Sequence, residues 1–518
     1  MKKLRLLLII ILPYTIQCQD LNIIPYPNKV EKDKGFFELK PNTSIIYEND
    51  LFEQAKQYEE SLERATGFSF ATRKATKNKT NSIVLRLNRK LPHLGEEGYT
   101  MKVTKSLVLI EAYNSNGIFW ALQTFLQLLP NDILREAKVD SKKWNIPNCK
   151  IVDKPRFAWR GLMIDYSRTF WNIRTTKKYI DALAFYKINK LHMHLTDDQG
   201  WRVEIENYPK LTDVASKFDT IYNEPKEREG YFKKSDIREL VAYAQARNID
   251  LIPEIEMPGH SSEVFSAYPE LTCKGEAMKI HPFTDGPNIH NEIFCAGNDE
   301  TFVFLKNILS EIIELFPSKY VHIGGDEAPK KHWKECDKCQ RRIRELNLKN
   351  EHGLQSWFIS QIEDYLSSNG KILIGWDEIV EGGLSPNATV MYWRAWENEV
   401  PEFVVNQGNN LIMTPTSHCY FDYGNETITI EKVYSYNPVP SIFNKKQSEK
   451  VLGVQANFWS HINRIEPEMD RQIFPRILAL AEVGWSDEQN KDWDRFTRSL
   501  NRHLKAFDVL GIYYYQKE

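Results

Sequence analysis

The stretch Tyr320-Val321-His322-Ile323-Gly324-Gly325-Asp326-Glu327 joins a short apolar run to two glycines and two adjacent carboxylates. The apolar residues are of types that favour strands, so the run predicts a buried strand. Consecutive residues of a regular strand point to opposite faces, so Asp326 and Glu327 could not share one site within it. Gly324 and Gly325 let the backbone leave strand geometry at little steric cost. Both carboxylates can then turn toward one ligand just past the carboxyl end of the strand.

Two carboxyl groups held close together tend to have different pKa values, so one can donate a proton while the other stays charged. The alternative is that Asp326-Glu327 merely caps the helix that follows, as many acidic pairs do. The histidine and the paired glycines ahead of the carboxylates favour a catalytic pair.

Composition is that of a soluble globular protein with room for one large domain and a smaller one. The 518 residues are 42% hydrophobic and 27% charged. A net charge of −2 gives no electrostatic reason to expect nucleic acid or an anionic membrane as a partner. Aromatic residues make up 12% of the chain, including 13 Trp. Sugar-binding sites use such flat faces to cover apolar C–H patches, although many of these rings must belong to the core.

The first residues have the pattern of an export signal. A basic start is followed by an unbroken apolar run at residues 6–12, too short to span a bilayer. We expect cleavage near Cys18, which makes residues 1–18 a signal peptide. A lipid anchor on Cys18 is less favoured, because Gln17 is a poor match to the small residue usually found before a lipidated cysteine. No later stretch is long and apolar enough to be transmembrane, so we expect an exported, soluble protein, periplasmic or extracellular.

Residues 21–150 are predicted to form a small α+β domain without a chemical motif. Its expected helices cover residues 51–65 and 117–129, and its expected strands cover residues 83–87, 99–103 and 107–112. A segment rich in Lys, Asn and Pro, at about residues 131–155, is expected to be a linker.

Residues 156–518 show a repeated pattern of a strand followed by a helix. Strands are predicted at residues 162–165, 191–195, 251–255, 320–323, 372–375, 390–393, 411–413 and 451–456. Eight strands that alternate with helices predict a (β/α)8 barrel followed by C-terminal helices. A doubly wound open sheet is the alternative, but it would usually show a Gly-rich phosphate loop, and the sequence has none.

Active sites of such barrels lie at the carboxyl ends of the strands. Polar and aromatic residues follow nearly every predicted strand, where a purely structural barrel has no need of them. In chain order these are Arg168, Asp197-Asp198, Glu256, His260, Asp326-Glu327, Trp376-Asp377-Glu378, Trp393, Tyr420, Asp422 and Trp459.

Export also makes disulfides possible, and six cysteines follow Cys18. Cys336-Asp337-Lys338-Cys339 has the spacing of half a zinc site, but no second Cys-x-x-Cys or paired His follows at metal spacing. We therefore favour a local disulfide between Cys336 and Cys339. A second disulfide is expected between Cys273 and Cys295, which flank the long loop after the third barrel strand.

The sequence resembles glycoside hydrolase family 20, the exo-β-N-acetylhexosaminidases, over nearly the whole mature chain. The stretch His322-Ile323-Gly324-Gly325-Asp326-Glu327 is highly specific to that family. Other family positions occur in the same order here: Arg168, Asp197, His260, Trp376, Trp393, Tyr420, Asp422 and Trp459.

The resemblance implies a substrate-assisted mechanism that retains the anomeric configuration through an oxazolinium intermediate. Glu327 would be the general acid and then the general base. Asp326 would orient the 2-acetamido group of the sugar, whose oxygen is the nucleophile, an exception to the scheme with two enzyme carboxylates. Physically, a fixed carboxylate suits an amide nucleophile that becomes cationic as it attacks. The resemblance implies no metal and no organic cofactor.

The remaining family residues would bind the oligosaccharide or glycoconjugate substrate. Tyr420 would donate a hydrogen bond to the acetamido oxygen, and Trp376, Trp393 and Trp459 would enclose its methyl group. Arg168 would hold the 3- and 4-hydroxyls, and Asp422 would lie near the 4- and 6-hydroxyls. Asp197 and His260 would keep Arg168 and the acid in place.

One position departs from the family pattern. The family usually has Trp-x-Glu on the last barrel strand, and this chain has Trp459-Ser460-His461. A Glu there binds sugar hydroxyls. With His461 in its place, the preferred terminal sugar could be GlcNAc, GalNAc or 6-sulfated GlcNAc. One hypothesis is that another residue or water replaces the contact. A sharper one is that a cationic His461 accepts a 6-sulfate, although Asp422 would oppose it.

Two other functions remain as alternatives to the hexosaminidase. The first is a catalytically silent glycan-binding protein on the same fold, against which the intact Asp326-Glu327 pair argues. The second is a retaining glycosidase with an enzyme nucleophile such as Glu378, which would also cleave sugars without an acetamido group. Neither the natural glycan nor the oligomeric state follows from the sequence.

Overall fold

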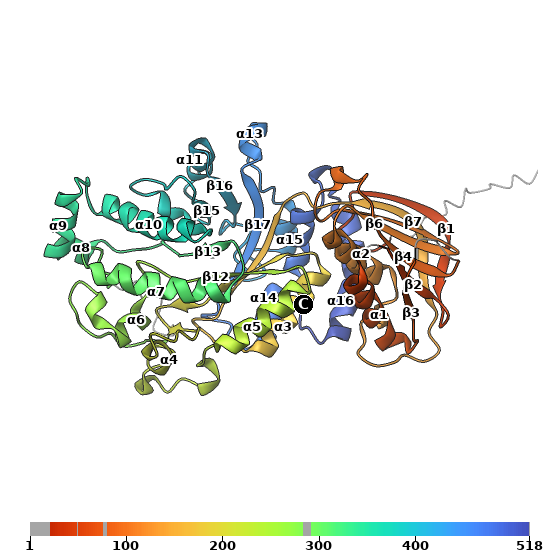
Figure 1. The fold of residues 1–518 in the computed structure, drawn as a ribbon, viewed down its shortest axis with the longest axis horizontal. Coiled ribbons are helices and arrows are strands. Elements are labelled where there is room, and N and C mark those ends of the chain that lie inside the picture. The colour runs from red at the N-terminus through yellow and green to blue at the C-terminus, as the bar shows by residue number, and fades with distance from the viewer. Residues whose placement is uncertain (1–20, 49, 76–79, 283–291, 517–518) are drawn as a thin grey trace, which may run out of the picture.

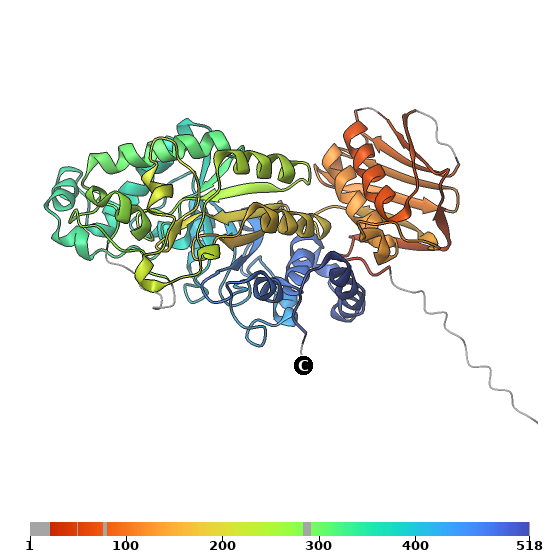
Figure 2. The same ribbon diagram turned by 90° about the horizontal axis from the view of Figure 1, so that it is seen from below.

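The computed structural model describes residues 21–48, 50–75, 80–282 and 292–516. The expected signal peptide, with Cys18, lies outside these residues. Figures 1 and 2 show an N-terminal body beside a larger one, with helix α16 (Trp493–Leu510) at their junction. Asn131 donates a side-chain hydrogen bond to the backbone oxygen of Arg502 in α16, at 2.8 Å. The last helix is thereby fastened to the N-terminal half of the chain.

The N-terminal body is a mixed seven-stranded sheet in the described part of the chain, in the order β1-β7-β5-β6-β4-β2-β3. Helices α1 (Phe52–Thr66) and α2 (Ser115–Leu128) pack on it. Its strands are β1 (Lys29–Leu39), β2 (Ser44–Tyr47), β3 (Ala71–Lys74), β4 (Ser82–Leu87), β5 (Tyr99–Thr104), β6 (Leu107–Ala112) and β7 (Trp144–Asp153).

The linker predicted at residues 131–155 is wrong, because β7 occupies its second half. β7 pairs antiparallel with both β1 and β5, so it lies inside the sheet. Trp144 and Ile146 are buried, and the buried positions shift by one at Asn148 and continue at Cys149 and Ile151. The intervening Lys, Asn and Pro residues obscure this pattern in the sequence. Pro147 is tolerated beside an irregularity of β1, where pairing shifts between Lys32 and Phe36.

Helix α2 joins the two bodies. It is apolar on nearly every side and is buried from Gly117 to Leu128, as expected for a helix between two layers. One side contacts β5 and β6, and on the other the ring of Trp120 lies 6.0 Å from that of Trp485. Gln127 donates to the backbone oxygen of Phe185 at 3.0 Å, across the junction.

The larger body is the predicted (β/α)8 barrel. Within the described residues, eight parallel strands close in the order β8-β9-β12-β13-β14-β15-β16-β17. These strands are β8 (Trp159–Asp165), β9 (Lys190–His194), β12 (Asp250–Glu254), β13 (Tyr320–His322), β14 (Ile372–Trp376), β15 (Thr389–Tyr392), β16 (Asn410–Met413) and β17 (Val451–Phe458). All eight predicted strands are confirmed.

Helices cover the outside of the barrel (Figure 1). They include α3 (Ile173–Phe185), α5 (Lys234–Gln245), α7 (Asp299–Leu315), α10 (Glu351–Ser368), α11 (Val400–Gln407) and α15 (Arg476–Trp485). Further helices lie in the connections: α4 (Lys210–Asp213), α6 (Ser262–Ala267), α8 (Lys331–Glu335), α9 (Asp337–Glu345), α12 (Ile430–Ser435), α13 (Lys445–Ser448) and α14 (Glu466–Ile473). The small hairpin of β10 (Thr196–Asp197) and β11 (Gly200–Trp201) follows β9. Among the described helices, none has the length and apolar character needed to cross a membrane.

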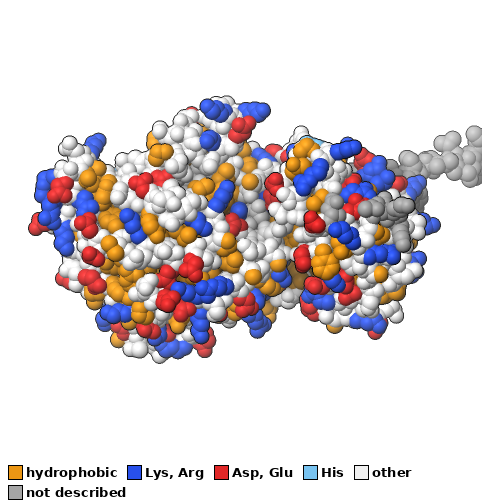
Figure 3. All heavy atoms as spheres, viewed as in Figure 1, with side chains coloured by type: hydrophobic (Ala, Val, Ile, Leu, Met, Phe, Trp, Pro, Cys, Tyr) orange, Lys and Arg blue, Asp and Glu red, His pale blue; other side chains and the backbone are white. Residues whose placement is uncertain are grey.

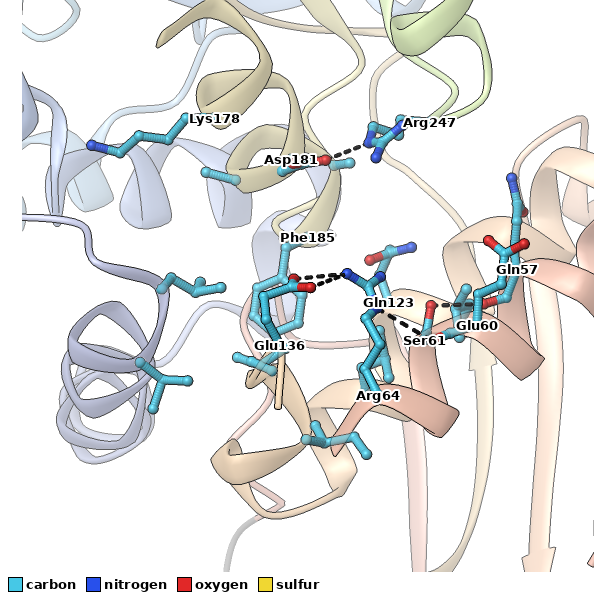
Figure 4. A pocket seen from close by; sticks show the side chains of 18 of the residues that line it. Gln57, Glu60, Ser61, Arg64, Gln123, Glu136, Lys178, Asp181, Phe185 and Arg247 are labelled. Atoms are coloured by element: carbon cyan, nitrogen blue, oxygen red, sulfur yellow. Dashed lines mark hydrogen bonds and ion pairs between the residues drawn. The ribbon is translucent and has the colours of Figure 1, made fainter. Parts of the chain in front are cut away.

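A cavity of about 580 Å³ lies between the two bodies (Figure 4). Its walls come from α1, α2, α3 and α5 and from residues 133–136 and 509–512, and they carry ion pairs such as Arg64–Glu136 at 2.7 Å. Among the described residues that line it, none is a predicted site residue. Figure 3 shows basic and acidic side chains interspersed over this face of the molecule, in keeping with the net charge of −2.

The predicted disulfides are wrong for this structure. Among the described residues, all six cysteines are free. Instead of pairing within their own loops, Cys273, Cys295, Cys336 and Cys339 come together in one cluster. Local spacing suggested the pairs, but the folded loops after β12 and β13 bring all four sulfurs to one point.

A buried ion pair also ties the two bodies together. Lys187 Nζ lies 2.9 Å from Asp153 Oδ2, and neither side chain is exposed to solvent. Asp153 further accepts hydrogen bonds from the Tyr99 hydroxyl at 2.8 Å and from Trp485 Nε1 at 2.9 Å. Burial lowers the pKa of Lys187, and the carboxylate of Asp153 opposes that shift.

Asp153→Ala is expected to destabilise the protein by about 3–5 kcal/mol, because it leaves the buried Lys187 ammonium without its counter-charge. The double variant Asp153→Ala/Lys187→Met also removes the unpaired ammonium. In urea unfolding its free energy of unfolding should fall by less than that of Asp153→Ala. The matched control Asp140→Ala breaks an exposed pair with Lys138 and should leave the midpoint nearly unchanged. If the single Asp153 variant is no less stable than the double one, the uncompensated charge is not the cause.

Candidate active site

The backbone after β13 turns sharply, as the paired glycines predict. Gly324 has φ +67° and Gly325 has φ +93°, in the left-handed region that glycine adopts most readily. A Cβ on Gly324 would lie 1.6 Å from Glu256 Oε2, so a side chain there would collide with the neighbouring strand end. Glu327 itself has φ +42°, a conformation uncommon for a residue with a side chain. This turn brings both carboxylates to one site.

His260 lies between the two carboxylates and a third one. Its Nε2 is 3.4 Å from Glu327 Oε2 and 3.7 Å from Asp326 Oδ2. Its Nδ1 is 3.2 Å from Asp197 Oδ1. Burial alone would lower the pKa of His260, but Asp197 and Asp326 raise it well above its usual value. The imidazole is therefore cationic at neutral pH and offsets part of the charge of the pair.

Asp326 is a buried carboxyl whose pKa is set by opposing effects of its surroundings. Burial raises the pKa of Asp326 to about 7, with Glu327 adding to the shift and His260 opposing it. Its Oδ1 is buried and, among the described residues, has no hydrogen-bond partner. Buried acceptors are nearly always satisfied in folded proteins, so this oxygen is suited to a donor from a ligand.

Arg168 is fixed at the end of β8 by partners on three sides. Its Nη2 lies 2.6 Å from Asp197 Oδ2, and its Nε donates to Gln199 Oε1 at 2.8 Å. The guanidinium carbon lies 5.0 Å from the centre of the Trp459 ring. Asp197 thus connects Arg168 to His260. Burial alone would raise the pKa of Asp197, but these two cations lower it well below its usual value.

Four aromatic side chains form a continuous wall beside the carboxylates. The ring of Trp459 lies 5.9 Å from Trp376 and 6.3 Å from Tyr420, and Tyr420 stacks on Trp393 at 6.1 Å. Burial, followed by the charges of Asp422 and Asp326, raises the pKa of Tyr420 well above its usual value. The phenol therefore keeps its proton and can donate a hydrogen bond.

Asp422 and His461 lie at the Arg168 side of the site. Burial raises the pKa of Asp422 to about 7, and its Oδ1 is a second buried oxygen without a partner among the described residues. Burial and the nearby charge of Arg168 lower the pKa of His461 to about 4. His461 is accordingly neutral at pH 7, which removes the support for a cationic sulfate-binding histidine.

Glu378 is part of the scaffold of the wall. Its Oε2 accepts a hydrogen bond from Trp393 Nε1 at 2.8 Å. Burial, with Asp326 and Asp377 nearby, raises the pKa of Glu378 well above its usual value. Asp377 accepts from the backbone of Trp393 at 3.2 Å and binds Arg394 at 2.5 Å. A protonated, hydrogen-bonded Glu378 is poorly suited to attack a sugar.

A polar layer beneath the site was not predicted from the sequence. Glu254 contacts three buried histidines: His192 at 3.1 Å, His322 at 2.7 Å, and His194. Although burial alone would raise the pKa of Glu254, these histidines lower it well below its usual value. His194 also reaches Asp197 at 2.8 Å, and the His322 ring lies 4.8 Å from Trp376. The His-x-His spacing on one strand, which points both rings to the barrel interior, was the available signal.

This geometry agrees with comparisons to known families. The model of "Glycosyl hydrolase family 20, catalytic domain" matches residues 157–488, and "Glycosyl hydrolase family 20, domain 2" matches residues 20–154. The chain belongs to glycoside hydrolase family 20. It is a glycosidase of the β-hexosaminidase type, which removes terminal N-acetylhexosamine.

Named family 20 relatives extend over most of the chain. A β-hexosaminidase of Porphyromonas gingivalis is 38% identical over 96% of this chain, which spans 64% of that protein's length. One from Akkermansia muciniphila is 33% identical over 82% of this chain and 88% of its own. The structure of the Vibrio harveyi exo-β-N-acetylglucosaminidase in complex with N-acetylglucosamine has a TM-score of 0.83 at 29% identity, and the match covers 96% of this chain and 78% of that one.

Proposed function

We propose that this family 20 glycosidase cleaves terminal β-linked N-acetylhexosamine with retention, using the acetamido group of its substrate as the nucleophile. The observation that carries the proposal is the buried Oδ1 of Asp326, which has no hydrogen-bond partner in the described part of the chain and lies beside the wall of Trp376, Trp459 and Tyr420. An acetamido group fits such a place, because its N–H can donate to Asp326 while its methyl group contacts the rings.

The reaction begins with attack of the acetamido oxygen on C1 of the sugar. Glu327 transfers its proton to the glycosidic oxygen as the C1–O bond breaks, and the aglycone leaves as an alcohol. Asp326 accepts a hydrogen bond from the acetamido N–H and stabilises the positive charge of the resulting oxazolinium ring. Water then attacks C1 while Glu327 takes its proton, and the ring opens to restore the acetamido group.

The other residues position the sugar. Tyr420, which keeps its proton, donates to the acetamido oxygen. Arg168 and the buried Oδ1 of Asp422 hold ring hydroxyls, and Asp197 holds Arg168 and His260 in place. Trp376, Trp393 and Trp459 exclude water from the acetamido group, which strengthens each electrostatic contact there.

The two alternatives have less support. The pKa of Glu378 lies well above its usual value, and its Oε2 accepts from Trp393 Nε1, so it is a poor nucleophile. A silent glycan-binding protein would not need a proton donor and a buried carboxylate turned to one point. Vibrio harveyi N-acetylglucosaminidase is described with N-acetylglucosamine bound, and GlcNAc is the first sugar to test here. We also propose that the chain is exported, from its N-terminal 18 residues.

Aryl glycosides that differ at C2 test the proposal. Aryl β-GlcNAc should be cleaved to the β-anomer, as followed by NMR during the first minutes, and aryl β-glucoside should not be cleaved. A thiazoline that mimics the bicyclic intermediate should inhibit competitively. Cleavage of the glucoside at a comparable rate would support an enzyme nucleophile, and the α-anomer as first product would exclude retention.

His461→Glu is expected to favour unsulfated sugar. Since His461 is neutral with a pKa of about 4, it offers at most one acceptor, whereas a carboxylate binding hydroxyls can contribute about 1.5–3 kcal/mol. The ratio of kcat/KM for aryl GlcNAc over aryl 6-sulfo-GlcNAc should rise roughly tenfold or more, since Glu also repels sulfate. In wild type this ratio should stay flat from pH 8 to 6.

The exposed His93→Glu serves as the control for added charge and should leave the ratio unchanged. An unchanged ratio in His461→Glu as well would mean that His461 does not set the preference.

A further inference from the structure

Four cysteines that lie far apart in the sequence meet at one point of the barrel. The Sγ atoms of Cys273 and Cys339 are 3.7 Å apart, those of Cys295 and Cys339 are 3.7 Å apart, and those of Cys295 and Cys336 are 3.8 Å apart. All four sulfurs lie within 4.8 Å of one another. We propose that these four cysteines bind one zinc ion as a structural site.

The distances match the edges of a zinc–thiolate tetrahedron. With Zn–S bonds of about 2.3 Å, neighbouring sulfurs in a tetrahedral site lie about 3.8 Å apart. A disulfide needs about 2.05 Å between sulfurs and one partner for each sulfur. Here Cys295 lies within 3.8 Å of two sulfurs, and Cys339 lies 3.7 Å from two. An arrangement in which each sulfur faces several others points to a shared central ion.

Two loops of different origin build the cluster. Cys336 precedes α9 and Cys339 lies in its first turn, so this pair has the Cys-x-x-Cys geometry of one half of a zinc site. Cys273 and Cys295 follow directly on Thr272 and Phe294, which are held side by side by an antiparallel bridge. The second half of the site is therefore made by loop closure, which no spacing motif reveals.

Gly297 allows the two halves to approach. A Cβ at this position would lie 2.2 Å from the backbone carbon of Lys338 and 2.4 Å from the backbone nitrogen of Cys339. The loop of Cys295 thus rests directly on the backbone of the Cys-x-x-Cys turn. Cys295 and Cys339 are buried, and Cys273 and Cys336 are partly exposed. An ion can reach the site from the surface and is then largely enclosed.

The site links the two loops that carry catalytic side chains. Phe294, next to Cys295, donates its backbone N–H to Pro258 at 2.9 Å, two residues before His260. Trp333 lies in α8, the helix that follows Glu327, and its Nε1 donates a hydrogen bond to the backbone oxygen of Phe294 at 2.9 Å. A zinc ion would fasten these loops to each other. Helices α8 and α9 lie at the end of the barrel away from the N-terminal body (Figure 1).

Four thiolates leave no open coordination position, so zinc would act here as a structural cross-link and not in hydrolysis. This assignment does not depend on the proposed function, because none of the four cysteines is among the proposed catalytic or sugar-binding residues. Zinc in place of disulfides also explains why the four sulfurs form a compact cluster and not two separate pairs.

Metal analysis of the full chain, purified without added metal or reductant, tests the proposal. We expect about one zinc ion per chain and little iron. Cys336→Ser/Cys339→Ser should lose the zinc, whereas the control Cys149→Ser, in β7 of the N-terminal sheet, should keep it. If zinc is replaced by cobalt, the wild type should show the visible bands of tetrahedral cobalt thiolate. Chelation should lower the Tm, and zinc should restore it.

Three results would overturn the assignment, and none requires a variant that folds. The first is metal-free wild-type protein whose four thiols react at once with a thiol reagent. The second is mass mapping of unreduced peptides that finds disulfides such as Cys273–Cys339 and Cys295–Cys336. The third is stoichiometric iron in place of zinc, since tetrahedral four-sulfur sites also suit iron.

Discussion

Glu327→Gln is expected to slow the cleavage of substrates with poor leaving groups by roughly 10²–10⁴-fold, the usual contribution of a general acid. Gln cannot transfer a proton to the glycosidic oxygen, so the rate of cleavage should fall most for natural disaccharides. Aryl substrates whose leaving group is already a stable anion need no such help in the first step. A plot of log kcat/KM against the leaving-group pKa should therefore be much steeper for the variant than for wild type.

The matched control for this prediction is Glu345→Gln, on the exposed surface of α9, which should follow the wild-type line. If Glu327→Gln lowers kcat/KM by the same factor for all substrates, Glu327 is not the proton donor.

Asp326→Asn is expected to reduce kcat by roughly 10²–10³-fold, the cost of removing a preorganised electrostatic contact to a charge that develops in the transition state. Asn retains the shape but not the negative charge that stabilises the oxazolinium ring. The loss should be similar for good and poor leaving groups, because Asp326 acts on the nucleophile. This behaviour separates it from Glu327.

The pH dependence offers a second test of Asp326. Its pKa is raised to about 7, so the charged form that the mechanism needs is lost as the pH falls through that value. Wild-type kcat/KM should accordingly fall on the acidic side with an apparent pKa near 7, since kcat/KM reports the free enzyme. Asp326→Asn should weaken this limb and leave only the part that comes from Asp422, whose pKa is also raised to about 7, whereas the exposed control Asp364→Asn should keep the whole limb. An unchanged acidic limb in Asp326→Asn would assign the titration to another group.

The barrel and the residues that face its site were predictable, because both follow from local pattern. Each barrel strand is a short apolar run, and the chemistry follows at its carboxyl end, as Asp326 and Tyr420 show. From the sequence, Gly324 predicted only that the backbone can turn there, and not that it lies close to Glu256. The space beside Gly324 is taken by the carboxyl group of Glu256, which lies 68 residues earlier in the chain, a separation that no local pattern covers.

What the sequence did not predict depends on contacts between distant segments. β7 was hidden because its polar positions resemble a linker, and it becomes a strand only between β1 and β5. Glu254 gave no signal alone, since its partners come from β9 and β13. The cysteines misled because local spacing favoured two disulfides, whereas Cys273 and Cys339 are 66 residues apart in the chain. These cysteines lie in the loops after β12 and β13, two strands that are neighbours only in the folded barrel.

The most direct test of the central claim is to change the nucleophile itself. Aryl β-glycosides with N-acetyl, N-fluoroacetyl, N-difluoroacetyl and N-trifluoroacetyl groups should be compared by kcat/KM with one leaving group. Each fluorine withdraws electrons from the carbonyl oxygen, so attack on C1 should weaken stepwise, and log kcat/KM should fall steeply along the series. A series with equal kcat/KM would mean that the acetamido oxygen does not attack, and the proposed mechanism would be wrong.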